Sequence, residues 1–195
     1  MPTPFKLVRV NGIKDTRLDT SAAYGTITFA KIARMAEQPT RRSKLEATGL
    51  IASTYNEPDA RSHTAQRERG RFHAFVLDID DGNHTLAFLD AALVSVFGDC
   101  ARIVYSTSSA TASAPKWRAI IPFEQAVSGT DYEQLQRAAF GALNDHGIKC
   151  DLAMQGAAQM AFLPNVPPDM RDTAGVPHFY ESLVVRTAGL KQPPA

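Results

Sequence analysis

The chain has 195 residues, of which 44% are apolar and 21% are charged, and its formal net charge is +1. These proportions are typical of a globular protein that is long enough to bury one substantial core. With only two cysteines, Cys100 and Cys150, the chain has neither a disulfide framework nor a thiolate zinc site. No apolar run approaches the roughly 20 residues of a membrane span, and the N-terminus lacks a basic start followed by an apolar segment, so we expect a cytoplasmic protein.

Charge is unevenly distributed along the chain. Residues 1–72 carry 13 Lys and Arg against 7 Asp and Glu, whereas residues 73–195 carry 8 against 13. A basic patch can follow a phosphate backbone, although charged runs are more often solvated surface. We take the following residues as candidate contacts to nucleic acid: Arg41, Arg42, Lys44, Arg67, Arg69 and Arg71.

The first third of the chain contains three predicted elements and a loop. Residues 5–10 alternate as a strand, residues 28–37 repeat apolar positions at helical spacing until Pro39, and residues 48–55 form a weaker strand pattern. Residues 56–71 are dominated by charged and polar side chains, which predicts a mobile loop.

The remaining elements follow in quick succession. They are strands at 72–80, 102–107, 117–123, 160–163 and 181–187, a helix at 84–97 capped by Asn83 or Thr85, and a helix at 131–146 opened by a capping box, Thr130 to Glu133. The strand at 72–80, the helix at 84–97 and the strand at 102–107 make a β-α-β unit. The strand at 117–123 is expected to pair antiparallel to the strand at 102–107. This predicts an α+β fold in which the two helices cover one face of a mostly antiparallel sheet, beside an N-terminal α/β portion.

The stretch Phe75 to Gly82 carries the strongest chemical signal. An apolar strand ends in Asp78, Ile79 and Asp80, and the two-residue period of a strand places both aspartates on one face. Neighbouring carboxylates repel each other, and oxygen ligands at this spacing suit Mg²⁺ or Mn²⁺. The alternative is a solvated acidic turn with ordinary turn residues after the strand.

Further polar groups follow the acidic strand end in order. A Ser/Thr-rich loop leads into a basic strand start, and a lone aspartate comes later, after an apolar residue. Phosphoryl transfer to a 3′-hydroxyl uses three carboxylates around two cations, with hydroxyls and basic groups holding the phosphates. The candidate catalytic and metal-binding residues are Asp78, Asp80 and Asp151; the candidate nucleotide-binding residues are Ser106, Ser108, Ser109, Lys116 and Arg118.

These motifs resemble the archaeo-eukaryotic primase superfamily, especially the primase-polymerase domains of phage and plasmid replication proteins. The resemblance covers roughly residues 45–165, and its motifs are Val76–Gly82, Val104–Ser109 with Pro115–Pro122, Cys150-Asp151, and Gln159–Pro164. It implies a modified RNA-recognition-type sheet, one catalytic domain over residues 1–188, divided into a basic portion 1–72 and an acidic-motif core 73–188, and a tail or linker at 189–195.

The resemblance also implies a DNA primase that carries out template-directed nucleotidyl transfer with two Mg²⁺ or Mn²⁺ ions. Its partners would be single-stranded DNA, nucleoside triphosphates and a replicative helicase domain or protein. The sequence departs from the family in the motif Val104–Ser109. In the family this motif usually ends in a histidine that contacts the phosphates of the nucleotide. Ala110 stands at the nearest position here, and Ser108, Ser109, Lys116 or Arg118 would have to replace the histidine.

Two other interpretations remain open. The sequence from Asp78 to Leu86 is similar to phosphatases of the haloacid dehalogenase type, in which Asp78 would be the nucleophile and Asp80 the general acid. Those enzymes also need a downstream lysine and an acidic pair at the end of a parallel strand, and no such pair follows here. The second alternative is a primase-like DNA-binding or initiation module that has lost the histidine, although such a module gains nothing from three clustered acids.

Overall fold

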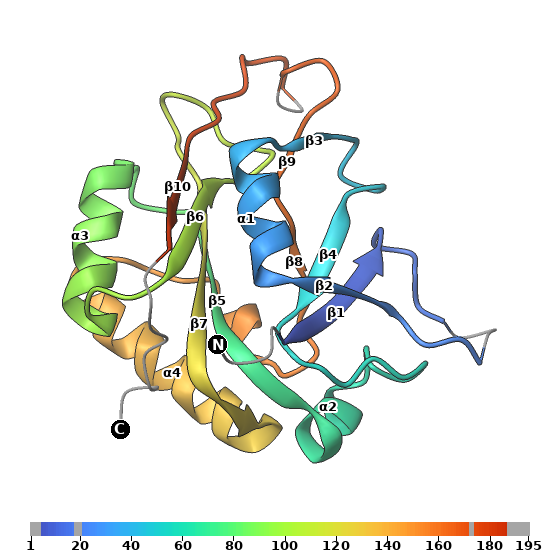
Figure 1. Ribbon diagram of the computed structural model, residues 1–195. Coiled ribbons are helices and arrows are strands. Elements are labelled where there is room, and N and C mark those ends of the chain that lie inside the picture. Colours follow the sequence, from blue (N-terminus) through green and yellow to red (C-terminus); the bar gives the residue numbers. More distant parts are fainter. Residues whose placement is uncertain (1–4, 18–20, 172–173, 187–195) are drawn as a thin grey trace.

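Two four-stranded sheets and four α-helices form the framework of the computed structural model, which describes residues 5–17, 21–171 and 174–186 (Figure 1). The N-terminal sheet has the order β2-β1-β4-β8, with β1 at Lys6–Asn11, β2 at Gly25–Thr28, β4 at Thr48–Ile51 and β8 at Ala161–Phe162. The central sheet has the order β10-β6-β7-β5, with β5 at Arg71–Ile79, β6 at Arg102–Ser106, β7 at Trp117–Ser128 and β10 at Ser182–Val185.

Helices and short elements connect the strands of both sheets. The helices are α1 at Phe29–Glu37, α2 at His63–Arg69, α3 at Leu86–Phe97, α4 at Gly129–Asp145 and a 3₁₀ helix, η1, at Leu152–Gln155. A parallel pair, β3 at Thr40–Arg41 and β9 at Asn165–Val166, lies apart from the two larger sheets. The prediction of mixed helices and mostly antiparallel strands is therefore confirmed.

The predicted β-α-β unit forms in the central sheet. Strands β5 and β6, on either side of α3, both pair antiparallel with β7, which lies between them. The two strands are consequently parallel to each other, and β7 is antiparallel to β6 as expected. This order brings the C-terminal ends of β5 and β6 and the N-terminal start of β7 to the same end of the sheet, which we call the acidic edge.

Helices α3 and α4 pack on aromatic residues of the central sheet. Phe75 contacts Phe97 of α3 with ring centroids 5.1 Å apart, and Phe72 stacks on Tyr132 of α4 at 4.1 Å. A bulge between Phe72 and Ala74 changes the alternation of β5, which lets both phenylalanines face helices. Helix α1 instead packs on β6 and β10, in front of this sheet in Figure 1.

Backbone hydrogen bonds join the N-terminal sheet to the first residues of β5. The amide of His73 donates to the carbonyl of Ala52 at 2.9 Å, and Ser53 forms an isolated bridge with Phe72. The amide of Val8 in β1 also donates to the carbonyl of Ser53, at 2.9 Å. The two sheets therefore share one hydrophobic core, which includes Leu7 and Trp117.

The prediction of a mobile loop at 56–71 is wrong, because this segment contains α2. The Ser62 hydroxyl caps the helix by accepting from the amide of Ala65 at 3.3 Å. Gln66 is fully buried and its side-chain amide donates to the carbonyls of Tyr55 and Ala60, at 2.9 and 2.8 Å. Ser followed by good helix formers and a terminal glycine is a helix signal that the abundance of charge obscured.

The start of α4 also differs from its prediction. Ser128 is the N-cap, and its hydroxyl accepts from the amide of Asp131 at 3.2 Å, so the predicted capping box from Thr130 to Glu133 does not form. Glu133 instead accepts from Arg67 and from the amide of Ala157, at 2.9 and 3.0 Å. The Glu133 carboxylate therefore binds residues distant in the sequence instead of capping its own helix.

The C-terminal predictions are met only in part. Strand β10 lies within the predicted strand 181–187, but the predicted tail at 189–195 lies outside the described residues. None of the described helices combines the length and the apolar character that crossing a membrane would require.

Candidate functional site

Three side chains form a row across the central sheet. In the strand register Asp78 of β5 pairs with Arg118 of β7, and Arg118 pairs in turn with Tyr105 of β6. Directly opposite residues of paired strands project from the same face. This face looks toward β8, whose Phe162 carbonyl accepts from Arg118 at 2.8 Å and from Tyr105 at 2.7 Å.

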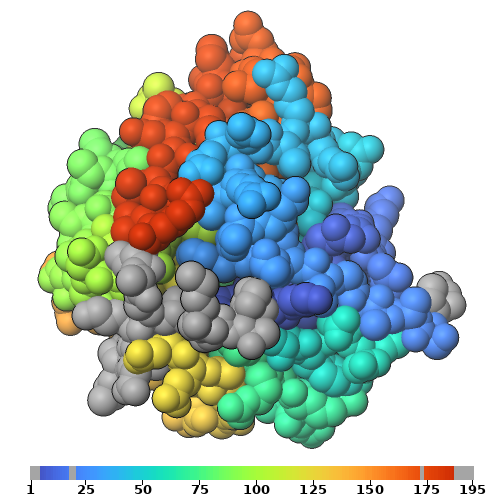
Figure 2. All heavy atoms as spheres, viewed as in Figure 1, coloured from blue at the N-terminus to red at the C-terminus, as the bar shows by residue number. Residues whose placement is uncertain are grey.

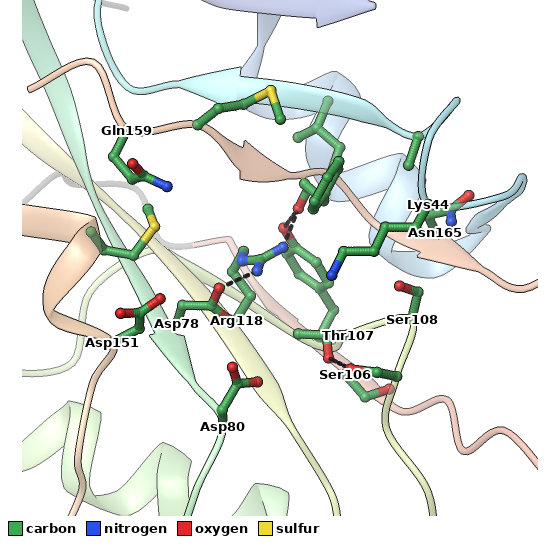
Figure 3. A pocket seen from close by; sticks show the side chains of 17 residues that line it. Lys44, Asp78, Asp80, Ser106, Thr107, Ser108, Arg118, Asp151, Gln159 and Asn165 are labelled. Carbon is green, nitrogen blue, oxygen red and sulfur yellow. Dashed lines mark hydrogen bonds and ion pairs between the residues drawn. The ribbon is translucent and has the colours of Figure 1, made fainter. Parts of the chain in front are cut away.

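A cavity of about 280 Å³ opens beside this row (Figure 3). The candidate residues that line it are Asp78, Asp80, Asp151, Ser106, Ser108, Ser109 and Arg118. In Figure 3 the acids lie on one side of Arg118, and the hydroxyl-bearing loop lies on the other. Residues from strand ends far apart in the sequence thus meet in one place, as the order of the motifs predicted.

Asp78 is the buried acid of the group. One carboxylate oxygen, Oδ2, accepts a short hydrogen bond from Arg118, while Oδ1 is buried and has no partner among the described residues. Burial raises the pKa of Asp78, and the negative charges of Asp80 and Asp151 raise it further, while Arg118 partly offsets both effects. Asp78 therefore carries an unsatisfied oxygen in a region of concentrated negative charge.

Arg118 faces the cavity but is already engaged. Only 6% of its surface is exposed, and its guanidinium donates to Asp78 and to the carbonyl of Phe162. Its neighbour on the strand, Trp117, is buried too, and the indole donates to the carbonyl of His84 at 2.8 Å. Arg118 is thus the internal counter-ion of Asp78 as well as part of the cavity wall.

The other two acids are more accessible. Half of the Asp80 side chain is exposed, and its carboxylate lies 3.8 Å from the ammonium of Lys116 at the rim. The amide of Asp151 donates to the carbonyl of Asp78 at 2.8 Å, which fixes Asp151 beside the end of β5. One oxygen of Asp151 caps η1 through the amide of Ala153 at 3.0 Å, so the other oxygen has no such role.

The donor set fits a divalent cation that is shared with a substrate. Within the described ranges, no three His, Cys, Asp or Glu side chains lie close enough together to hold an ion by themselves. Asp78, whose Oδ1 has no partner among the described residues, nevertheless lines the same cavity as the more accessible Asp80 and Asp151. Mg²⁺ takes one or two carboxylates and completes its shell with water and phosphate oxygens, which matches this arrangement.

The serine hydroxyls at the end of β6 and in the loop after it differ in their exposure and in their hydrogen-bond partners. The Ser106 hydroxyl donates to the carbonyl of Phe179 at 3.1 Å and accepts from the amide of Glu181 at 3.0 Å, so it holds the chain toward β10. Ser108 is half-buried and Ser109 is exposed, and both line the cavity. Their hydroxyls are better placed for a ligand than that of Ser106.

The six basic candidates do not form one surface. Arg67 and Arg69 are paired with Glu133 and Asp59, and Arg71 donates to the carbonyl of Ala126. Arg71 opens β5 and Asp78 lies seven residues later, which corresponds to about 23 Å along the strand. Arg41, Arg42 and Lys44 belong to the β3 region, and of the six only Lys44 lines the acidic cavity.

Two cavity residues, Gln159 and Asn165, were not among the predicted site residues. Lys44, which was predicted as a DNA contact, instead extends into the cavity from the side opposite Asp151 in Figure 3. Gln159 is the first residue of the motif Gln159–Pro164, so the sequence resemblance could have identified it. No local sequence pattern identifies Asn165. His178 does not line the cavity, but its Nδ1 lies 3.0 Å from the carbonyl of Ala110, the residue that stands at the position of the expected histidine.

Gln136 of α4 holds the acidic edge together from within the core. Its buried side-chain amide donates to the carbonyls of Val76 and Met154, at 2.9 and 3.0 Å, which ties β5 to η1. We expect Gln136→Ala to lower the free energy of unfolding by about 2–4 kcal/mol, because two buried carbonyls lose their donor. Urea unfolding measures this. Gln134→Ala, on the exposed side of the same helix, should change it by less than about 0.5 kcal/mol, and equal losses in the two variants would contradict the role of Gln136.

The structure is similar to a solved domain, the archaeo-eukaryotic primase domain of the primase-polymerase of cyanophage S-2L. The similarity covers 97% of this chain and 85% of that chain, with a TM-score of 0.50 and 11% sequence identity. The chain has an archaeo-eukaryotic-primase-like fold. No family model matches the sequence, and no curated protein matches it either.

Proposed function

We propose that this protein is a nucleotidyltransferase that extends or starts nucleic-acid chains on a single-stranded DNA template. The observation that carries the proposal is the composition of one cavity: three acids lie on one side, and hydroxyls and a lysine lie on the other. The acids are Asp78, Asp80 and Asp151, and the other side has Ser108, Ser109 and Lys44. A primase-like fold around this cavity supports the same reaction class. The strand order β6-β7-β5 also agrees with a modified RNA-recognition-type sheet. In this protein the segment before η1 lies beside the end of β5.

In the proposed reaction the O3′ atom of a primer forms a bond to the α-phosphorus of a nucleoside triphosphate. The bond between that phosphorus and the oxygen that bridges to the β-phosphorus breaks, pyrophosphate leaves, and the hydroxyl proton passes to water. Ser108 and Ser109 would donate hydrogen bonds to the phosphates. Lys44 and Lys116 would bind the same group from the cavity wall and the rim.

Mg²⁺ or Mn²⁺ bound by Asp78, Asp80 and Asp151 would supply charge neutralisation for the triphosphate and activation of the hydroxyl. Arg118 would keep Asp78 ionised and oriented through one carboxylate oxygen, while the other oxygen has no hydrogen-bond partner among the described residues. Tyr105 and Phe162 form part of the remaining wall of the cavity.

The antiparallel surroundings of Asp78 argue against the phosphatase alternative. That alternative needs an acidic pair at the end of a parallel strand, but both β5 and β6 are flanked by antiparallel partners. The DNA-binding module remains as the rival that the experiment must separate from the enzyme.

The test is to incubate the protein with a single-stranded template, labelled nucleotides and Mn²⁺, and to separate the products on a sequencing gel. We expect a ladder of products whose sequence follows the template. Release of phosphate from small phosphoesters without a ladder would favour the phosphatase, and retention of DNA with neither activity would favour the binding module.

A further inference from the structure

A second hollow, of about 660 Å³, lies on the N-terminal sheet between β1, β2, α1 and residues 38–48, and we call it the basic groove. Five of its lining residues are cationic and none is acidic: Lys6, Arg9, Lys31, Arg34 and Arg42. In Figure 2, α1 and the N-terminal strands lie on the viewed face of the molecule. Such a concentration of one charge in a hollow attracts anions.

The cations of the basic groove have no carboxylate partner among the described residues. Within the described part of the chain, no salt bridge involves any of the five, whereas Arg67, Arg69 and Arg118 are each paired with a carboxylate. Arg9 carries a stronger signal, because its Nε is buried and has no hydrogen-bond partner among the described residues. A buried unpaired guanidinium nitrogen is costly unless a ligand completes it.

Gly25 makes room for this arginine. A Cβ atom at Gly25 would lie 2.9 Å from Nη2 of Arg9 and 3.1 Å from its Nε, so a side chain at this position would make the guanidinium shift from its place over β2. Ile27 and Met35 add apolar surface to the same groove. The groove therefore offers both a partly buried arginine and exposed cations.

The basic groove adjoins the acidic cavity. Thr40 and Arg42 line the groove, and Asn165 lines the cavity. The Asn165 side chain accepts from the Thr40 hydroxyl at 3.1 Å and donates to the Arg42 carbonyl at 2.9 Å. The β3–β9 pair therefore lies between the two sites.

We infer that the basic groove binds the phosphate backbone of a single strand of DNA that continues toward the acidic cavity. This inference rests on the proposed function for the choice of DNA. Of the six predicted contacts it keeps Arg42, and it replaces Arg67, Arg69 and Arg71 with residues of α1 and the N-terminal strands. A single strand can bend into a hollow and over the β3–β9 pair, whereas duplex DNA is stiff over about 150 base pairs. The cations suit phosphates, as in other positively charged grooves that bind a single strand.

The experiment measures binding of a fluorescent single-stranded oligonucleotide by anisotropy over a range of salt concentrations, without nucleotide or metal. Three exposed cations are replaced in one variant, Lys31→Gln/Arg34→Gln/Arg42→Gln. Loss of three phosphate contacts should weaken binding at least about tenfold at moderate salt and reduce the slope of log K against log salt by about 2, at about 0.7 per contact.

The matched control removes the same charge from the other candidate surface, with Arg67→Gln/Arg69→Gln/Arg71→Gln. We expect this control to retain most of its affinity. A larger loss in the control than in the groove variant, equal losses in both, or tighter binding of poly-glutamate or of duplex DNA than of the single strand would overturn the inference.

The same assay separates this inference from the proposed function. Asp80→Asn should bind the oligonucleotide at least as well as the native protein, because the acid lies outside the groove. Groove-dependent binding without any product ladder would refute the nucleotidyl transfer and leave the groove assignment standing. A product ladder together with unchanged binding by the groove variant would refute the groove and leave the transfer standing.

Discussion

Replacing Asp80 with asparagine is expected to reduce nucleotide incorporation at least about a hundredfold, which is the scale on which removal of one charge-stabilising group slows an enzyme. Asp80 lies directly after β5, lines the cavity, and has half of its side chain exposed to a ligand. The change keeps the size of the side chain but removes the charge. Primer extension with labelled nucleotides and Mn²⁺ measures the rate.

Asp81 provides the matched control because it is the next acid in the chain, is exposed, and does not line the cavity. Asp81→Asn should keep the rate within about twofold of the native protein, since a solvated carboxylate outside the site interacts weakly with it. If both variants lost activity equally, general negative charge at this turn would be responsible instead of a ligand at Asp80. Full activity of Asp80→Asn would remove the catalytic assignment altogether.

Loss of Arg118 should destabilise the fold strongly, because its charge is buried against a single carboxylate. Arg118→Met is expected to lower the free energy of unfolding by about 3–5 kcal/mol, since it leaves Asp78 without its counter-ion. The side chains of Arg118 and Asp78 are only 8% and 13% exposed, and Arg118 also holds the Phe162 carbonyl of the other sheet. Urea denaturation followed by circular dichroism gives the value.

An exposed pair supplies the comparison for Arg118. Arg69 and Asp59 are 50% and 49% exposed, so Arg69→Met should cost less than about 1 kcal/mol. The double variant Asp78→Asn/Arg118→Met should recover a large part of the loss, since it leaves no uncompensated charge. No recovery in the double variant would mean that packing, and not the ion pair, accounts for the cost.

The sequence allowed the acidic edge of the sheet to be predicted because its signals are local. The alternation of Asp78, Ile79 and Asp80 places both acids on the face of the cavity and buries the isoleucine, as a strand requires. The helical spacing of α1, α3 and α4 likewise reflects the burial of one face of each helix. Such patterns depend on neighbours within a few residues and can be read without knowing the fold.

The features that were missed depend on contacts between distant residues. Glu133 belongs to a predicted cap but binds Arg67 and Ala157, and Ser106 belongs to a predicted phosphate loop but holds Phe179 and Glu181. A count of charges identified a basic N-terminal portion. It could not tell which arginines are neutralised by carboxylates that the fold brings to them.

The same limit explains why the sequence pattern assigns Lys44 to DNA and gives Lys6 no role. Lys44 reaches the acidic cavity because β3 pairs with β9, a contact between residues more than 120 positions apart. Lys6 joins the basic groove because β1 pairs with β2 and with β4. Neither pairing leaves a mark on the local sequence.

The most direct test of the central claim is a titration of Mn²⁺ followed by electron paramagnetic resonance, with and without a non-hydrolysable nucleoside triphosphate. If the cavity holds ions jointly with substrate phosphates, the native protein should bind Mn²⁺ weakly alone and at least about tenfold more tightly with the nucleotide present. Asp78→Asn/Asp80→Asn should lose that gain, and Asp81→Asn should keep it. Equal Mn²⁺ binding by the native protein and the double variant, with nucleotide present, would contradict the claim that these acids form a nucleotidyl-transfer site.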